Sequence, residues 1–378
     1  MTKPSRLQDL QPRWARFCLS IDHFLARELS LDLKGRTLLV ALSGGVDSTA
    51  LILAAHLLRH RWQASLQAAH LNHNLRPEAD QEAGSVERLC ADLNIPCHTG
   101  NSSVAVYAHR FHLGLEEAGR ILRYRFLHGI KRKTEAHFVL TGHHLNDLAE
   151  DVLLRLVRGT GWPGLAGMEA LDRGSGLLRP LLLVPKQELL EFVSSMGLKW
   201  HEDASNQDEA FTRNRVRQSI MPLLLQENPN LLQTVKQMWR QARVDASYFD
   251  QTLEALKSSE VHDQGAVLVP KQALAATHPA LRLRWYRDIL NRLGPGQALS
   301  ANLFALDELM PRTGTAQFPG DKRAVVDREW VRFLISPAKS RARMKRHEED
   351  PLSPAGSSQD PSGPRPAPLG KGEQSGEQ

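Results

Sequence analysis

A short run of serine and glycine, Ser43–Ser48 (SGGVDS), stands between a hydrophobic stretch and a region with helical spacing. Gly44 and Gly45 let the backbone approach a phosphate closely, and free N–H groups at the start of a helix attract an anion. The run differs from GxxxxGK[ST], because it has no lysine for β- and γ-phosphates, and it also lacks GxGxxG. The residues predict an anion site, with a tight turn capped by Asp47 or Ser48 as the alternative.

A second polar cluster reads HHLNDLAE and contains His143, His144, Asn146 and Asp147. Imidazoles can move protons near neutral pH, and a carboxylate can hold an amine or a metal ion. The cluster follows an apolar stretch at a point where the predicted fold places ligands. The alternative is a helix start at Asn146 or Asp147, with Glu150 completing a capping box.

Zinc is a further possibility for the histidines of this region. His70 and His73 on one segment, with His143 and His144 on another, could supply imidazole ligands. No Cys-x-x-Cys pair accompanies them, so the typical spacing of a zinc site is missing. The sequence therefore gives little support to a zinc centre.

Apolar runs alternate with amphipathic stretches from residue 37 to about 222. We expect strands at 37–42, 65–73, 95–100, 137–144 and 177–184, and helices at 47–60, 80–92, 116–133, 147–157 and 186–196. This alternation predicts an α/β domain with a five-stranded, parallel, doubly wound sheet. Ligands then bind at the carboxyl ends of the strands, where both polar clusters begin.

The remainder of the chain has a different pattern. We expect one long linker helix over about 230–260 and a small α+β unit over 265–335, with a helix at 281–294 and a strand at 324–335. Beyond it, proline, glycine and serine supply 16 of the 28 residues of 351–378, which predicts disorder. A basic stretch, 339–346, precedes that tail. It is either a solvated segment or a phosphate contact.

Composition narrows the class of protein. The chain has 378 residues and a net charge of +6, which suits a nucleic-acid partner without requiring one. No apolar run approaches the length of a membrane span, and the N-terminal residues lack the apolar core of a signal peptide. Three scattered cysteines argue against a disulfide framework, so we expect a cytoplasmic protein.

Placed after a hydrophobic strand, SGGVDS resembles the PP-loop of the N-type ATP pyrophosphatases, whose fold is similar to the adenine nucleotide alpha hydrolases. Four further segments, taken in order, resemble the tRNA(Ile)-lysidine synthetase family. They are HLNHNLR (70–76), LEEAGRILRYRFL (115–127), TGHHLNDLAED (141–151) and the segment 200–224. The match covers about 36–225 and extends more loosely to about 335. It implies four domains: an N-terminal helical extension (1–35), the catalytic domain (36–225), a linker helix with a small tRNA-contacting domain (226–337) and the tail (338–378).

The resemblance implies a ligase that forms a carbon–nitrogen bond. The family uses ATP, L-lysine and magnesium to convert the wobble cytidine of the CAU-anticodon isoleucine tRNA to lysidine, which changes the codon read from AUG to AUA. The C2 oxygen of cytosine first attacks the α-phosphate and releases pyrophosphate. The ε-amine of lysine then attacks C2 and displaces AMP. The negative charge that grows on the phosphate oxygens needs hydrogen-bond donors that are held in place. The protonated lysine amine needs a carboxylate to hold it and a base to accept its proton.

The resemblance also implies roles for individual residues. Catalytic roles fall to Asp47, Arg120, Arg123, His143, His144 and Asp147. ATP contacts fall to Ser43, Gly44, Gly45, Val46, Asp47, Ser48, His70, Asn72 and His73. Contacts to tRNA are expected from Arg76, Arg213, Asn214, Arg215, Arg217, Arg282 and Arg284, and magnesium is expected at Asp47 and Asp147. For each arginine cluster, a solvated helix face is the alternative.

One departure from the family pattern lies in the second cluster. The family has two aspartates and then Glu-Thr after the histidines, whereas this chain has Asn146-Asp147 and then Glu150-Asp151. Of the family's two aspartates, this chain therefore keeps only the one at Asp147. A role that needs both aspartates is not available to this chain.

Three other functions fit parts of the sequence. A tRNA thiolase of the same fold needs a sulfur carrier, commonly a Cys-x-x-Cys pair, and Cys90 and Cys97 are not spaced in that way. A small-molecule amidotransferase or ligase would not need the basic segments. A tRNA-binding protein without catalysis would not need the intact Ser43–Ser48 run. The sequence leaves a homodimer possible.

Overall fold

The computed structural model describes residues 6–73, 79–198, 200 and 212–336. Its chain divides into two compact units, Met1–Ala255 and Leu256–Gln378, and each is considered by itself here. Arg76, most of 200–211 and the tail lie outside the described residues, as does the basic stretch 339–346. The four-domain division therefore stays a prediction.

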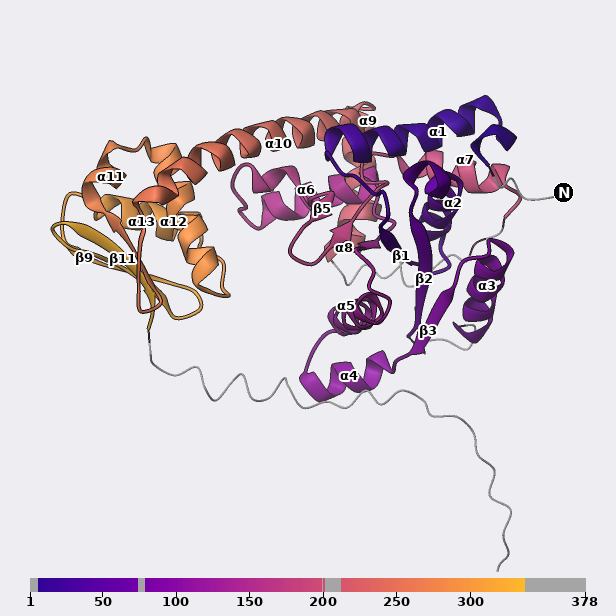
Figure 1. Ribbon diagram of the computed structural model, residues 1–378, viewed down its shortest axis with the longest axis horizontal. Coiled ribbons are helices and arrows are strands. Elements are labelled where there is room, and N and C mark those ends of the chain that lie inside the picture. The colour runs from indigo at the N-terminus through magenta and orange to yellow at the C-terminus, as the bar shows by residue number, and fades with distance from the viewer. Residues whose placement is uncertain (1–5, 74–78, 199, 201–211, 337–378) are drawn as a thin grey trace, which may run out of the picture. The chain divides into compact units, whose positions relative to one another are not determined.

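The first unit alternates strands and helices, as the apolar pattern predicts (Figure 1). Its strands are β1 (Thr37–Ala41), β2 (Ser65–Asn72), β3 (Cys97–Asn101), β4 (Phe138–Leu140), β5 (Leu171–Asp172) and β6 (Leu177–Leu178). Its helices are α1 (Pro12–His23), α2 (Val46–Trp62), α3 (Ala79–Asp92), α4 (Val104–Phe111), α5 (Leu115–Lys133), α6 (Leu145–Val157), α7 (Lys186–Ser195), α8 (Thr212–Arg215), α9 (Met221–Glu227) and α10 (Leu231–Leu256). Two π-helical turns, Phe24–Glu28 and Val216–Ile220, continue α1 and α8.

The strand order of the sheet is β3-β2-β1-β4-β6-β5. The first five of these strands run parallel, which confirms the predicted α/β class. The short β5 adds an antiparallel edge that the sequence did not predict. The chain leaves β1 toward β3 and returns to β4 on the other side of β1, so the carboxyl ends of β1 and β4 form a topological switch point.

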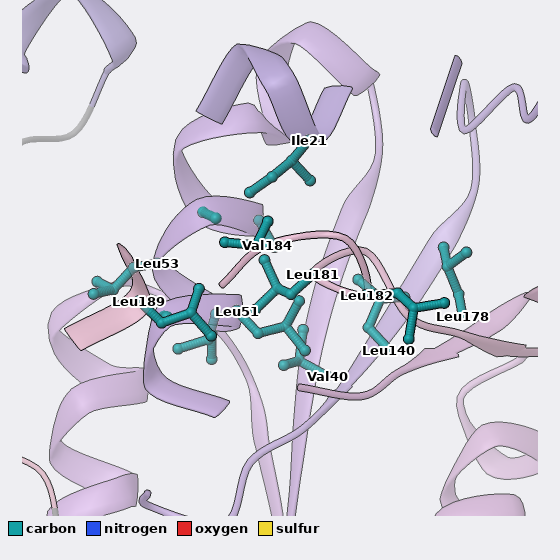
Figure 2. Close-up of a cluster of buried hydrophobic side chains, with 14 of the residues drawn as sticks. Ile21, Val40, Leu51, Leu53, Leu140, Leu178, Leu181, Leu182, Val184 and Leu189 are labelled. Atoms are coloured by element: carbon teal, nitrogen blue, oxygen red, sulfur yellow. The ribbon is translucent and has the colours of Figure 1, made fainter. Parts of the chain in front are cut away.

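Alternate residues of β1 pack on opposite faces of the sheet, because successive side chains in a strand point to opposite sides. Val40 belongs to the large buried cluster formed with α1, α2 and α7. Leu39 belongs to a smaller cluster that includes Leu127 of α5. Figure 2 shows part of the larger cluster, with Val40 of β1, Leu51 of α2 and Val184 among its labelled side chains. Helices on both faces bury the sheet and hold the strand ends in place.

The predicted fifth strand, 177–184, is wrong in its length. Only Leu177 and Leu178 pair with the sheet, and the chain then turns, with the N–H of Val184 donating to the carbonyl of Leu181. Pro180 has no N–H to donate to a neighbouring strand. The leucines that follow it are buried within the turns, so this apolar run reflects burial rather than strand structure.

The second unit is a small α+β structure, as predicted. Its antiparallel sheet has the order β7-β8-β11-β10-β9, with β7 (Val261–Asp263), β8 (Ala266–Pro270), β9 (Gly314–Phe318), β10 (Lys322–Val326) and β11 (Trp330–Ile335). Its helices are α11 (Lys271–Ala276), α12 (Pro279–Leu293) and α13 (Ser300–Glu308). The buried face of α12 supplies Trp285, Tyr286, Ile289 and Leu290 to the core of this unit.

The single strand predicted over 324–335 is a hairpin in the structure. Oδ1 of Asp327 accepts hydrogen bonds from the backbone N–H groups of Glu329, at 2.9 Å, and Trp330, at 2.7 Å. An aspartate that binds the backbone two and three residues ahead stabilises a turn. The Asp327 turn therefore separates β10 from β11.

Phe192 ties the N-terminal helix to α7. Its fully buried ring lies 4.7 Å from the ring of Phe17 and 5.6 Å from that of Trp14, measured between centroids. We expect Phe192→Ala to lower the free energy of unfolding by about 3–5 kcal/mol, because it leaves a cavity beside the rings of Trp14 and Phe17. Urea denaturation measures this, with Leu19→Ala on the exposed side of α1 as the control. Equal losses in the two variants would contradict this account of the core.

Candidate active site

The Ser43–Ser48 loop joins the end of β1 to the start of α2. Gly44 has a φ of +90°, a conformation that favours glycine. Oγ of Ser48 accepts the N–H of Ser43 at 3.1 Å and donates to the carbonyl of Gly45 at 3.0 Å, so the serine folds the loop back on itself. Gly45 is the N-cap of α2, so capping by Asp47 or Ser48 is wrong. The carboxylate of Asp47 is therefore available for other contacts.

Gly142, which follows β4, packs directly against this loop. A Cβ atom at Gly142 would lie 3.0 Å from the carbonyl carbon of Asp47 and 3.1 Å from the backbone nitrogen of Ser48. Real Cβ atoms rarely come so close to backbone atoms, so only glycine fits here without displacing the loop. This contact brings His143 and His144 to the Ser43–Ser48 loop at the switch point.

His144 is the N-cap of α6 and forms a capping box with Asp147. Its Nδ1 accepts the N–H of Asp147 at 3.4 Å, and Oδ2 of Asp147 accepts the N–H of His144 at 3.1 Å. The capping box proposed between Asp147 and Glu150 is therefore wrong, because the helix begins at Leu145. A neutral His144 whose Nδ1 accepts a hydrogen bond carries its proton on Nε2.

The Nε2 atom of His144 lies between two carboxylates. It is 3.6 Å from Oδ1 of Asp47 and 3.4 Å from Oδ2 of Asp147. Asp47 also accepts two hydrogen bonds from Nζ of Lys186, at 2.8 and 2.9 Å. Burial would raise the pKa of Asp47, but His144 and then Lys186 outweigh burial and lower the pKa below its ordinary value. Asp47 is therefore an anion at neutral pH.

Asp147 and Glu150 share two arginines from the segment that follows residue 211. Arg213 binds Oδ1 of Asp147 at 2.9 Å and Oε2 of Glu150 at 3.1 Å. Arg217 binds the same Asp147 oxygen at 3.1 Å and Oε1 of Glu150 at 2.7 Å. Burial would raise the pKa of Asp147, but His144 and Arg213 lower it to about 2. Both carboxylates lie deep in the protein, and each is held by two guanidinium groups.

His143 lies beside this cluster, half-buried, with Nδ1 2.9 Å from the hydroxyl of Thr141. Burial lowers its pKa to about 4; the charge of Asp147 opposes this, and Arg179 and Arg213 reinforce it. The imidazole is therefore neutral at pH 7 and can accept a proton.

Arg120 and Arg123 are exposed on α5. The guanidinium of Arg120 lies over the ring of Tyr124, 5.0 Å from its centroid, and its charge also lowers the pKa of His143. Arg120 is thus electrostatically linked to the histidine cluster. Neither arginine belongs to the inner group of paired charges.

The end of β2 supplies the other residues predicted to bind ATP. Nδ1 of His70 lies 2.8 Å from the carbonyl of Leu42, which ties the ends of β1 and β2 together. The buried Nε2 of His70 has no hydrogen-bond partner among the described residues. Asn72 donates to Asp80 at 2.9 Å, and His73 follows the strand. Their predicted contacts with ATP stay predictions.

The remaining residues predicted to bind tRNA lie in two places. Arg215 donates to the hydroxyl of Thr212, and Asn214 is half-buried beside it. In the second unit, Arg282 binds both carboxylate oxygens of Asp307, as well as the carbonyls of Leu274 and Thr277. Arg284 donates to the carbonyl of Ala280. The contacts of Arg282 favour a structural role.

The histidines weighed for zinc and the cysteines weighed for sulfur transfer can be placed in the described part of the chain. It contains no group of three or more His, Cys, Asp or Glu side chains arranged to hold a metal ion. The four histidines considered for zinc therefore do not form such a group. Cys97 is the first residue of β3, at the opposite end of that strand from the carboxyl edge, and Cys18 and Cys90 are buried.

Comparison with known proteins places this site in a family. The PP-loop domain model matches residues 17–224. The tRNA(Ile)-lysidine synthase of Nitratidesulfovibrio vulgaris is 42% identical over 318 residues, which are 79% of this chain and 92% of that protein. The chain belongs to the tRNA(Ile)-lysidine synthase family. The predicted family is therefore confirmed.

Other relatives are longer than this chain. The tRNA(Ile)-lysidine synthase of Clostridioides difficile is 32% identical over 69% of this chain, and the match spans 57% of that protein. Among solved structures, the U34-tRNA thiolase NcsA from Methanococcus maripaludis has a TM-score of 0.48 and 16% identity, covering 60% of this chain and 77% of that one.

Among the residues that the structure describes, no helix is both long and apolar enough to cross a membrane.

Sequence reasoning about this family member missed three residues of the site. Lys186 stands 139 positions from Asp47, and no motif connects them. Glu150 was considered only as part of a cap. Gly142 lies inside the quoted segment, but its role depends on a backbone approach that only the fold creates. The sequence signal for Glu150 was its place one helical turn beyond Asp147.

Gly142→Ala tests the contact between β4 and the loop. We expect a loss of about 1–3 kcal/mol in the free energy of unfolding and weaker ATP binding, because the methyl group must push the loop away. Gly129→Ala on α5 is the control, since nothing lies within 4 Å of a Cβ atom there. Denaturation and nucleotide titration measure both variants. Wild-type behaviour of Gly142→Ala would show that the close approach is unimportant.

The low pKa of His143 predicts acid sensitivity. An unfolded histidine takes up a proton near pH 6.5, whereas folded His143 does so only near pH 4, so stability falls as the pH drops between these values. Between pH 7 and about pH 4.5 we expect the wild type to lose on the order of 2 kcal/mol more than His143→Gln. Chemical denaturation across this range measures the difference. His56, whose pKa burial also lowers to about 4, is present in both proteins and cancels. Identical pH dependence of the two proteins would contradict the shift.

Proposed function

We propose that the protein joins L-lysine to C2 of the wobble cytidine in the CAU-anticodon isoleucine tRNA, using ATP and releasing AMP and pyrophosphate. One observation carries this proposal: the phosphate-binding loop and the His143–Asp147 cluster meet, with Nε2 of His144 3.6 Å from Asp47 and 3.4 Å from Asp147. An ATP site is thereby joined to carboxylates that suit a lysine amine. Membership of the family supplies the reaction class.

Adenylation is the first step. The C2 oxygen of cytosine attacks the α-phosphate, the bond to the β-phosphate breaks, and pyrophosphate leaves. Negative charge grows on the phosphate oxygens, and backbone N–H groups of the Ser43–Ser48 loop, at the start of α2, are suited to stabilise it. Arg120 or Arg123 can add positive charge from α5. The glycines allow the backbone to approach closely enough.

Lysine attack is the second step. The ε-amine attacks C2, the bond from C2 to the AMP oxygen breaks, and the amine loses its proton. A lysine amine has an ordinary pKa of about 10.4, so it arrives protonated and needs a carboxylate to hold it. Asp47 and Asp147 are the anions nearest the loop. His143 is the candidate proton acceptor, because its imidazole is neutral at pH 7 and its contact with Thr141 uses Nδ1, whereas both nitrogens of His144 are already engaged. Its low pKa makes it a weak base that passes the proton on rather than keeping it.

Magnesium fits Asp47 better than Asp147. Magnesium in phosphate-transfer sites is commonly held by one or two carboxylates together with substrate phosphates. Asp47 is partly exposed in the first turn of α2, and its two oxygens contact the partly exposed ammonium of Lys186. Asp147 is buried, and its two oxygens contact His144 and two arginines. Bound there, the ion would offset charge on the phosphates. The protein residues would still position the base and the amine.

The most direct experiment is nucleoside analysis of the isoleucine tRNA after incubation with ATP, magnesium and lysine. We expect lysidine, with one AMP and one pyrophosphate for each residue formed, and no lysidine in a CAU-anticodon methionine tRNA. A thiolated nucleoside would instead support the thiolase alternative. Binding of tRNA without any modification would support the non-catalytic alternative.

Asp147→Asn tests the site residues in the same assay. We expect lysidine formation to slow at least about tenfold, because a charge-assisted contact is lost. The matched control is Asp151→Asn, which lies on the same helix and pairs with Arg155 at 2.7 Å. A wild-type rate for Asp147→Asn at saturating substrates would remove Asp147 from the mechanism.

A further inference from the structure

Lys186 brings an ammonium group to the phosphate-binding loop from a distant part of the sequence. It is the first residue of α7, and its Nζ is 2.8 and 2.9 Å from the two carboxylate oxygens of Asp47. Asp47 lies in the first turn of α2, directly after Gly45 and Val46. The ammonium of Lys186 is therefore close to the N–H groups that are suited to bind phosphate.

The loop itself has no lysine. In GxxxxGK[ST] loops a lysine within the motif reaches the β- and γ-phosphates, while backbone N–H groups hold the rest. In SGGVDS the side chains are two hydroxyls, one valine and one carboxylate, and that carboxylate would repel a triphosphate. A cation from elsewhere in the chain is needed to offset this repulsion. The ammonium of Lys186 lies at the carboxylate of Asp47 and can supply this positive charge.

The backbone of Lys186 is fixed, whereas its side chain is partly exposed. Its N–H donates to Oδ1 of Asn146 at 3.0 Å, and the N–H of Leu145 donates to the carbonyl of Val184 at 2.9 Å. These two bonds tie the start of α7 to the start of α6. The side chains of Lys186 and Asp47 are 36% and 32% exposed, so solvent can replace either partner when the pair opens.

We propose that Lys186 is the phosphate-binding lysine of this site. When ATP binds, its ammonium leaves Asp47 and pairs with an oxygen of the β- or γ-phosphate. The move neutralises charge on the leaving pyrophosphate and releases the carboxylate of Asp47. This inference rests on the proposed function, which requires ATP at the loop and an anion at Asp47 for the lysine amine or magnesium.

Nucleotide binding without tRNA or lysine tests the proposal. We expect Lys186→Met to weaken ATP binding about tenfold or more and AMP binding less than about twofold, because AMP has no β- or γ-phosphate. Lys186→Arg keeps the charge and should keep most of the affinity. The control is Lys257→Met in the second unit, a lysine of similar exposure that pairs with Asp288. Unchanged ATP affinity, or equal losses for ATP and AMP, would overturn the proposal.

A second variant separates phosphate binding from simple neutralisation of Asp47. If Lys186 only cancels the charge of Asp47, adding Asp47→Asn to Lys186→Met should restore ATP affinity to the value of Asp47→Asn alone. We expect the double variant to stay several-fold weaker than Asp47→Asn. Full restoration would overturn the assignment. Circular dichroism of each variant shows whether it is folded.

The same measurements separate this inference from the proposed function. Binding of ATP does not require lysidine to form, so a Lys186-dependent ATP affinity in a protein that makes no lysidine would overturn the proposed function alone. Conversely, lysidine formation by Lys186→Met with an unchanged KM for ATP would overturn the role of Lys186 alone.

Discussion

Charge balance around three carboxylates is the constraint on which this site depends. Asp47, Asp147 and Glu150 lie together at the carboxyl end of a parallel sheet, and none of them is fully exposed. Partly buried anions are stable only when cations or donors are close. Lys186, Arg213 and Arg217 supply those cations, and they come from segments far along the chain. The last third of the first unit is therefore needed to complete a site whose anions come from its first 150 residues.

This balance explains why two arginines predicted to bind tRNA or ATP face inward. Arg213 and Arg217 each contact Asp147 and Glu150, and burial lowers the pKa of both guanidinium groups less than these carboxylates raise it. An arginine with its N–H groups shared between two carboxylates offers little to a phosphate. Removing either carboxylate would leave both guanidinium groups with a single carboxylate to share. The conformation of residues 212–217 therefore depends on the carboxylates of Asp147 and Glu150 in α6.

The sequence predicted where the parallel strands lie, but not every strand end, because hydrophobic runs, glycines and polar clusters are local signals. The Ser43–Ser48 loop and the His143–Asp147 cluster were both found in this way, and the fold brings them together. Lys186 was not found, because a single lysine at a helix start resembles any solvated lysine until a distant carboxylate is placed beside it. Strand was also predicted where the chain turns, at 179–184 and at Asp327. An apolar pattern indicates that residues are buried, but it does not show whether their backbone is extended. Local patterns therefore locate the parts of this site, while their pairing comes from strand order.

Strand order also bears on the sequence of events at the site. The carboxylate of Asp47 cannot bind Lys186 and a substrate amine at full strength together, because both cations need the same two oxygens. If a triphosphate draws Lys186 away, the anion that holds the lysine amine becomes available only after ATP has bound. Lysine entering first would instead meet a carboxylate already neutralised by the protein. The ion pair across the switch point would thus favour adenylation before amine attack, which is the order that the two chemical steps require.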